Sequence, residues 1–273
     1  MKNRDNQTTT TTASQFFGYR YPPFSDTFEV HTPFRTETDT LAAQRTLALL
    51  RQAKSLAIHG EAGCGKSMLT KSIINLLDPK AYRVAILPYG GLKASAILRE
   101  LCEKFGLDTA GRKNLLSRLA ADFTRANHKP FPIIIVDDAH AMENQSFIDL
   151  CSLLHEGQAR TAAAALLLIG QPQLKRKLEL DIFAPVRTRL ACMLRIPTLT
   201  IEEAKEFIAF RLNIAEADPN LFDQQAMECL AVDAKGNRRM LMNMGALCLE
   251  EAARRKENVI TSEIVTTVST EMI

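Results

Sequence analysis

The stretch LAIHGEAGCGKSMLT, residues 56–70, decides how the chain is interpreted. It joins a short apolar run to a glycine-rich turn and a Lys-Ser pair that opens a helical pattern. Gly60, Gly65, Lys66 and Ser67 have the spacing G-x-x-x-x-G-K-[ST]. In such a loop, backbone N–H groups turn inward around phosphate oxygens at the positive end of the following helix. A plain glycine turn is the alternative, but the strand before and the helix after favour a phosphate-binding loop.

A second motif, FPIIIVDDAH at residues 131–140, supplies the acidic side chains that a nucleotide site needs. Asp137 ends an apolar strand pattern, where an ionised carboxylate is costly unless it meets a cation or strong donors. Mg²⁺ is that cation, ligated by the Ser67 hydroxyl and held through water by Asp137. Asp138 lies where P-loop hydrolases often have a glutamate that orients the attacking water. Its alternative is a helix N-cap.

Polar residues further along the chain can meet the phosphate end of a nucleotide. Gln171 follows the apolar run LLLIG, and its amide can touch the γ-phosphate or the attacking water. Arg187 and Arg189 lie in APVRTRL, and Arg238 and Arg239 lie in GNRRML. An arginine, sometimes from a neighbouring subunit, neutralises charge that develops on a transferred phosphoryl group. Solvated surface positions are the alternative for all four arginines.

Apolar strand patterns and helical patterns alternate through the first two thirds of the chain. Strands are expected at 56–60, 82–89, 131–139 and 163–170, with helices at 38–53, 66–77, 95–106, 113–126 and 144–156. Strands this uniformly apolar are buried on both faces, which indicates an α/β fold with a parallel sheet between helical layers. After Pro197 only helical patterns follow, at 200–215, 223–234, 238–256 and 261–273.

The predicted organisation therefore has three parts. Residues 1–15, rich in Thr, Asn and Gln, form a disordered tail. Residues 16–196 form the α/β nucleotide-binding domain, which begins with an irregular strap of aromatics and prolines, and residues 197–273 form a small all-helical domain.

Composition excludes several classes of protein. The net charge of +3 is too small to indicate a nucleic-acid partner by itself. The six cysteines are scattered without a CxxC pair, which indicates buried thiols in a reducing compartment instead of disulfides or a zinc site. No apolar run approaches the roughly 20 residues that span a bilayer, and the polar N-terminus lacks a secretory h-region. A cytoplasmic protein with no membrane partner is expected.

Charge is unevenly distributed along the chain. Residues 93–129 hold eight Lys or Arg against four acids, a local net charge of +4. Lys93 lies in a glycine-bearing loop, and Arg112 and Lys113 begin a predicted helix. These residues can follow a phosphate backbone, although solvated helix faces are the alternative. Because aromatic residues are not interleaved here, duplex DNA is favoured over single strands.

The motifs FFGYRYPPF, GEAGCGKS, IIIVDDAH, LLIGQPQL, RTRL and GNRR, in this order, resemble an AAA+ ATPase. More narrowly, the chain resembles the group of ExeA-type ATPases and the transposition regulators MuB, TniB and TnsC. The resemblance implies ATP and Mg²⁺ as cofactors, and a P-loop AAA+ domain followed by a helical lid.

The resemblance also implies roles for residues that match the motifs. The nucleotide-binding set is Gly60, Glu61, Ala62, Gly63, Cys64, Gly65, Lys66, Ser67, Met68 and Arg239, with Ser67 and Asp137 on the metal. The catalytic set is Asp138, Gln171 as sensor 1, Arg189 or Arg187 as arginine finger, and Arg239 as sensor 2. Lys93, Arg112 and Lys113 match places that line the inside of a DNA-bound helical filament.

Two departures from the family pattern matter. Asp138 replaces the usual glutamate and is one methylene shorter, so slow hydrolysis is expected. Arg238 replaces a usual proline, which leaves open which arginine faces the nucleotide.

The implied function is an ATP-dependent, non-sequence-specific DNA-binding regulator of transposition. It is expected to oligomerise as a helix or ring on duplex DNA and to recruit or stimulate a DDE-type transposase. We expect a chain that ends just after the lid, without the membrane span and envelope-binding region of ExeA-type proteins or the winged helix of replication loaders. The alternatives are an ExeA-like cytosolic ATPase that energises secretion or another protein assembly and, third, a helicase loader.

Overall fold

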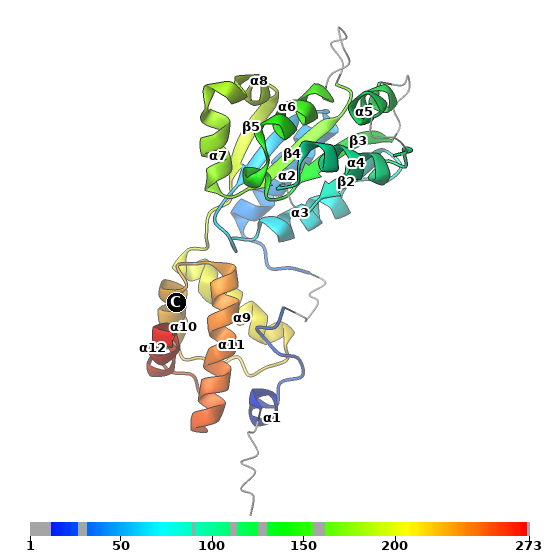
Figure 1. Cartoon of the computed structure of the whole chain (residues 1–273). Coiled ribbons are helices and arrows are strands. Elements are labelled where there is room, and N and C mark those ends of the chain that lie inside the picture. The colour runs from blue at the N-terminus through cyan, green and yellow to red at the C-terminus, as the bar shows by residue number, and fades with distance from the viewer. Residues whose placement is uncertain are drawn as a thin grey trace, which may run out of the picture. The chain divides into compact units, whose positions relative to one another are not determined.

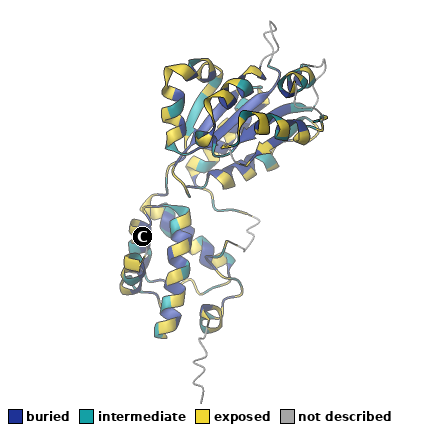
Figure 2. Cartoon of the chain, in the orientation of Figure 1, coloured by how far each residue is buried: buried dark blue, intermediate teal, exposed yellow. Residues whose placement is uncertain are grey.

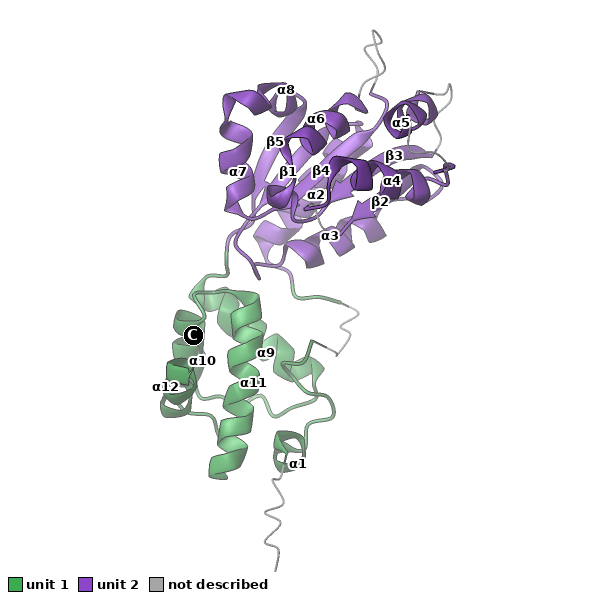
Figure 3. Ribbon diagram, in the orientation of Figure 1, with its two compact units in different colours: residues 1–34, 198–273 green, residues 35–197 purple. Residues whose placement is uncertain are grey.

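The computed structural model describes residues 12–26, 32–88, 91–109, 114–124, 130–154 and 162–271. These residues form two compact units, each described here by itself (Figure 3). The α/β unit consists of residues 35–197, and the helical unit combines residues from 1–34 with residues from 198–273. The chain therefore passes from one unit to the other twice.

The α/β unit is built on a five-stranded sheet in the order β2-β3-β4-β1-β5 (Figure 1). All neighbouring strands pair in parallel. The strands are β1 (Ser55–His59), β2 (Tyr82–Leu87), β3 (Phe131–Val136), β4 (Ala165–Gly170) and β5 (Leu190–Arg195). Because the strands are parallel, their carboxyl ends lie along one edge of the sheet, which is where ligands bind in open α/β folds.

Helices cover both faces of this sheet. They are α2 (Glu37–Arg51), α3 (Lys66–Asn75), α4 (Ala94–Lys104), α5 (Leu115–Phe123), η1 (Ala139–Ala141), α6 (Asn144–Ser152), α7 (Pro172–Glu179), η2 (Asp181–Phe183) and α8 (Ala184–Arg187). Side chains of β3 alternate between the two apolar cores: Ile134 and Val136 pack with α4 to α8, and Ile133 and Ile135 pack with α2 and α3. The three central strands β1, β3 and β4 are accordingly buried almost throughout, while the outer helix faces are exposed (Figure 2).

The helical unit contains α1 (Ala13–Phe17), α9 (Ile201–Ile214), α10 (Gln224–Asp233), α11 (Arg238–Arg255) and α12 (Ser262–Glu271). Its core includes Tyr19 and Phe24 of the aromatic strap. The buried Arg211 of α9 fastens the strap, because its Nε donates to the Pro23 carbonyl at 2.6 Å and its Nη2 donates to the Ser25 carbonyl at 3.1 Å.

The predicted fold class is confirmed, and most helices and strands lie within a few residues of their expected bounds. Three differences stand out. The strap packs in the helical unit and not in the α/β unit as expected, because its aromatic rings fill that unit's core. Within the expected tail, Ala13 begins α1 and is buried, while residues 1–11 lie outside the described residues. The edge strand β5 was missed because its residues are only half-buried, so it lacks a uniformly apolar pattern.

Of the six cysteines, Cys64, Cys102, Cys151 and Cys248 are buried as expected, while Cys192 and Cys229 are half-buried. None of the helices in the described part of the chain is long and apolar enough to cross a membrane.

Candidate functional site

The glycine-rich loop joins the end of β1 to the start of α3, as the motif requires. Gly63 and Gly65 have φ values of 77° and 109°, which lie in the region that favours glycine. At Gly60 an added Cβ would come within 2.4 Å of the Ile196 carbonyl oxygen and 2.7 Å of the Cys64 Sγ. Side chains are therefore excluded from these positions, and the backbone itself lines the loop.

Lys66 lies inside this loop and not on the surface. The residue is only 8% exposed, and its Nζ donates to the carbonyls of Gly60 at 2.8 Å and Glu61 at 2.7 Å. Ser67 and Met68, in the first turn of α3, are exposed. A buried ammonium group beside a glycine-rich loop, at the N-terminus of a helix, fits a site for phosphate oxygens.

Asp137 follows directly after β3, at the same edge of the sheet. Its backbone N–H donates to the Leu87 carbonyl at 2.9 Å, and its Oδ1 accepts from the Asp138 N–H at 2.9 Å. Burial raises the pKa of Asp137, while the hydrogen bond from Asp138 and the charge of Lys66 lower it. A divalent cation at this carboxylate would offset the cost of burial, so the residue fits the Mg²⁺ that a nucleotide brings.

Asp138 adopts the left-handed conformation, with φ of 47° and ψ of 36°. It occupies the N-cap position of η1, but its side chain makes no capping hydrogen bond there. Asp138 therefore has the position of an N-cap residue but does not make the side-chain hydrogen bond of one. Half of the side chain is exposed, so its carboxylate can reach a water molecule.

Gln171 follows β4, which lies between β3 and β1 in the sheet. The loop and β4 meet directly, because the Gly60 N–H donates to the Gly170 carbonyl at 3.2 Å. Gln171 begins α7, and its side chain makes no capping hydrogen bond. The strand order thus brings the loop, the Asp137–Asp138 pair and Gln171 together at one edge of the sheet.

The arginine-finger candidates lie at the end of α8, and both are exposed. The Nη1 of Arg187 donates to the carbonyls of Leu178 and Glu179, at 2.9 and 3.0 Å. The Nη1 of Arg189 donates to the Pro185 carbonyl at 2.7 Å. Arg187 is the more firmly anchored of the two, since it joins α8 to the last turn of α7.

The sensor-2 candidate Arg239 is an exposed residue in the first turn of α11. Its backbone N–H donates to the Asn237 side chain at 3.1 Å, and Arg238 beside it is half-buried. Both arginines belong to the helical unit, so a role at the nucleotide stays a prediction.

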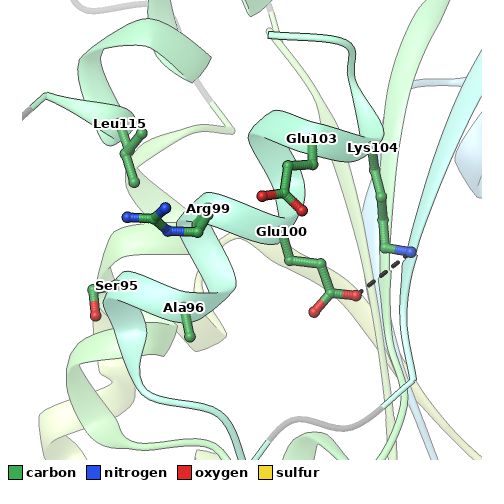
Figure 4. A pocket seen from close by; sticks show the side chains of 7 residues that line it. All are labelled: Ser95, Ala96, Arg99, Glu100, Glu103, Lys104 and Leu115. Carbon is green, nitrogen blue, oxygen red and sulfur yellow. Dashed lines mark ion pairs between the residues drawn. The ribbon is translucent and has the colours of Figure 1, made fainter. Parts of the chain in front are cut away.

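Of the three DNA-binding candidates, only Lys93 can be placed. It is exposed at the N-cap of α4, whereas Arg112 and Lys113 lie outside the described residues. A groove of about 850 Å³ runs over α4, lined by Ser95, Ala96, Arg99, Glu100, Glu103, Lys104 and Leu115 (Figure 4). Lys104 pairs with Glu100 at 3.5 Å across this face. The residues that line this pocket are of mixed charge, and the Lys104 ammonium already has an acidic partner.

Three residues near the site were missed by sequence reasoning: His59, His140 and Lys177. His59 ends β1 and is 8% exposed, and its Nδ1 has no hydrogen-bond partner among the described residues. Burial lowers its pKa, and the charges of Lys175 and Arg195 lower it further. The sequence did carry a signal for His59, because a histidine ends an otherwise apolar strand pattern.

A family model described as an AAA domain matches residues 49–178. Among curated proteins, the chain is similar to general secretion pathway protein A of Aeromonas hydrophila, at 24% identity over 222 residues. That match covers 80% of this chain but only 40% of the length of the relative.

Solved structures of Cdc6p and ORC proteins have a similar fold. Cdc6p of Pyrobaculum aerophilum matches with a TM-score of 0.71 and 16% identity, covering 92% of this chain and 70% of that one. The Aeropyrum pernix ORC1 protein in complex with DNA matches with a TM-score of 0.68 and 16% identity, covering 93% and 69%. Drosophila ORC bound to DNA matches with a TM-score of 0.73 and 14% identity, covering 100% and 70%.

These matches support an AAA+ ATPase with the P-loop fold. None of these proteins is described by a role in transposition, so the narrower resemblance to MuB, TniB and TnsC is not supported by them.

Proposed function

We propose that this chain is an AAA+ ATPase that binds ATP with Mg²⁺ at the loop 60–67 and hydrolyses it slowly. One observation carries the proposal: the buried Lys66 ammonium and the half-buried Asp137 carboxylate lie at one sheet edge, beside the glycine-rich loop 60–67. A metal–triphosphate complex needs both charges. The backbone of 60–67 and Lys66 would hold the phosphates, and Ser67 and Asp137 would hold the metal, which neutralises phosphate charge.

Hydrolysis is assigned to residues around this pocket. Asp138 would orient the attacking water, and its short side chain is the reason for a slow rate. Gln171 would contact the γ-phosphate. The guanidinium that stabilises the transferring phosphoryl group would come from Arg189 of an adjacent copy, since Arg187 already binds two local carbonyls. Arg239 would close the helical lid over the nucleotide.

For the use of ATP, we favour ATP-dependent, non-sequence-specific binding to duplex DNA by an oligomer that regulates transposition through a DDE-type transposase. Three features support this choice. The ordered motifs resemble transposition regulators, two structures of the same fold are described as bound to DNA, and Lys93 stands exposed at the start of a basic segment.

A mobility-shift assay with duplex DNA of unrelated sequences tests this function. Binding should require ATP or a slowly hydrolysed analogue, and should weaken steeply with salt, with a log–log slope of about 0.9 for each phosphate contacted. Lys93→Gln should weaken binding to all sequences alike, while Lys104→Gln, whose ammonium already pairs with Glu100, serves as the matched control. Binding that ignores both nucleotide and salt would contradict the proposal.

The second candidate is an ATPase that energises a protein assembly, as the similarity to general secretion pathway protein A favours. Sedimentation with and without ATP and duplex DNA separates the two functions. ATP-driven self-assembly that DNA neither promotes nor joins would favour the second candidate.

A further inference from the structure

His140 lies between the two turns to which hydrolysis is assigned. It is the middle residue of η1, which follows Asp138, and its side chain is four-fifths buried at 19% exposure. The backbone determines the position of His140, because the left-handed conformation of Asp138 turns the chain after β3.

The imidazole contacts the sensor-1 turn directly. The backbone N–H of Gln171 donates to the His140 Nδ1 at 3.4 Å. This bond needs the Nδ1 lone pair, so the ring proton of the neutral imidazole lies on Nε2. The Asp138 Oδ1 is 3.8 Å from the same Nδ1. In this tautomer both Nδ1 and the Asp138 Oδ1 are acceptors, so the two atoms do not share a proton. The Asp138 carboxylate therefore stays available to a water molecule.

The two turns are also packed tightly against each other. A Cβ added at Gly170 would come within 3.2 Å of the His140 backbone nitrogen and 3.1 Å of the Leu174 Cβ. Such an approach leaves little room for one turn to move without the other. The Gln171 turn and the Asp138 turn therefore shift as a pair, with His140 as the polar contact between them.

Lys177 makes a second connection between α7 and the segment after Asp138. Its Nζ donates to the Met142 carbonyl, and it lies over the ring of Phe147 at 5.1 Å and the ring of Phe183 at 5.9 Å. This connection is one turn and a half further along α7 and does not touch the Asp138 or Gln171 side chain. Lys177 anchors the later part of α7, whereas His140 contacts the turn at the start of α7, where Gln171 lies.

We propose that His140 is a positioning residue for ATP hydrolysis: it holds the Gln171 turn against the Asp138 turn, so that the amide and the water-orienting carboxylate keep a fixed separation. This inference rests on the proposed ATPase function. It predicts that His140 acts on the chemical step through Gln171 and not on nucleotide binding.

The matched variants are His140→Asn and His140→Leu. The Oδ1 of asparagine takes the place of Nδ1 and can accept from the Gln171 N–H, whereas leucine has a similar volume and no acceptor. In the full chain, His140→Leu should lower kcat about 10- to 100-fold, the effect expected of a misplaced catalytic group. The Kd for a fluorescent ATP analogue should stay within about twofold, and His140→Asn should keep kcat within about threefold of wild type.

A double-mutant cycle separates positioning from general loss of structure. In a Gln171→Ala background there is no side-chain amide to position. The further loss of kcat on adding His140→Leu should therefore shrink to less than about threefold. Thermal unfolding of each variant checks that the fold is retained.

Three results would overturn the inference: an unchanged kcat in His140→Leu, a loss that is equally large in the Gln171→Ala background, or a weakened Kd that accounts for the whole effect. A wild-type chain that binds ATP but never hydrolyses it would instead overturn the proposed function, and with it this role.

Discussion

The α/β unit and the helical unit bury their polar groups in different ways. In the α/β unit, the buried atoms Thr46 Oγ1, His59 Nδ1, Arg83 Nε and Ser146 Oγ have no hydrogen-bond partner among the described residues. In the described part of the helical unit no such atom occurs, and Arg211 gives its protons to strap carbonyls. Buried unpaired polar groups are costly and tend to collect where a structure serves function. Of the four, His59 directly precedes the loop 60–67, whereas Thr46, Arg83 and Ser146 lie in α2, β2 and α6. The α/β unit therefore carries the cost of unpaired polar atoms, at the candidate site and elsewhere, and the described part of the helical unit does not.

The largest expected effect comes from removing the loop cation. Lys66→Ala should lower ATP hydrolysis about 1,000-fold or to background, because no other ammonium lies within the loop to meet the phosphates. Steady-state phosphate release measures this, with the exposed Lys80→Ala as control. If Lys66→Ala hydrolyses ATP at the wild-type rate, the α/β unit does not hold the site.

On the helical side, Arg211→Met should reduce the free energy of unfolding by about 2–4 kcal/mol, because it leaves the Pro23 and Ser25 carbonyls without their donor. Urea unfolding followed by circular dichroism measures the loss. Lys205→Met, at an exposed ion pair with Glu228, should cost less than about 1 kcal/mol. Equal losses in both variants would mean that the strap is not held by Arg211.

Asp138→Glu tests whether the short side chain of Asp138 limits the rate of ATP hydrolysis. The added methylene should raise kcat by about three- to tenfold, since the carboxylate then reaches the attacking water more closely. The same change at Asp149, on the half-buried side of α6, should leave the rate unchanged. A rate that is unchanged or lower in Asp138→Glu would remove the explanation for slow turnover.

The smallest expected effect is a pH dependence that resides in the α/β unit. Burial holds the pKa of His59 below its ordinary value of 6.5, and Lys175, Arg195 and Lys66 lower it further while Glu179 raises it. His59 therefore binds a proton near pH 6.5 in the unfolded chain, but only at lower pH in the folded chain. The stability from neutral His59 is present above pH 6.5 and is lost as pH falls below it.

Urea unfolding at pH 7.5, 6.5 and 5.5 measures this dependence. His59→Gln, which cannot titrate, should flatten the decline between pH 6.5 and 5.5. An identical decline in the variant would show that other groups, and not His59, carry it.

Sequence reasoning located the parts of the candidate site whose signals are local. The loop 60–67 and the Asp137–Asp138 pair were found because chemistry requires particular residue types at fixed spacing, next to a strand and a helix. Gln171 was found because it is a polar residue directly after the apolar run LLLIG. The edge strand β5 was not found, since a strand that is half-buried and carries Arg195 has no uniform apolar pattern.

By itself, then, the sequence determined an α/β unit with a glycine-rich loop between its first strand and the following helix, because backbone geometry and burial pattern act over a few neighbouring residues. Only the tertiary structure decided that the strap packs with the helical unit and that His140 meets Gln171, 31 residues away. Those contacts depend on strand order and on which core an aromatic ring fills. Neither is encoded in local spacing, because parallel strands that are neighbours in space are separated in the chain by whole helices.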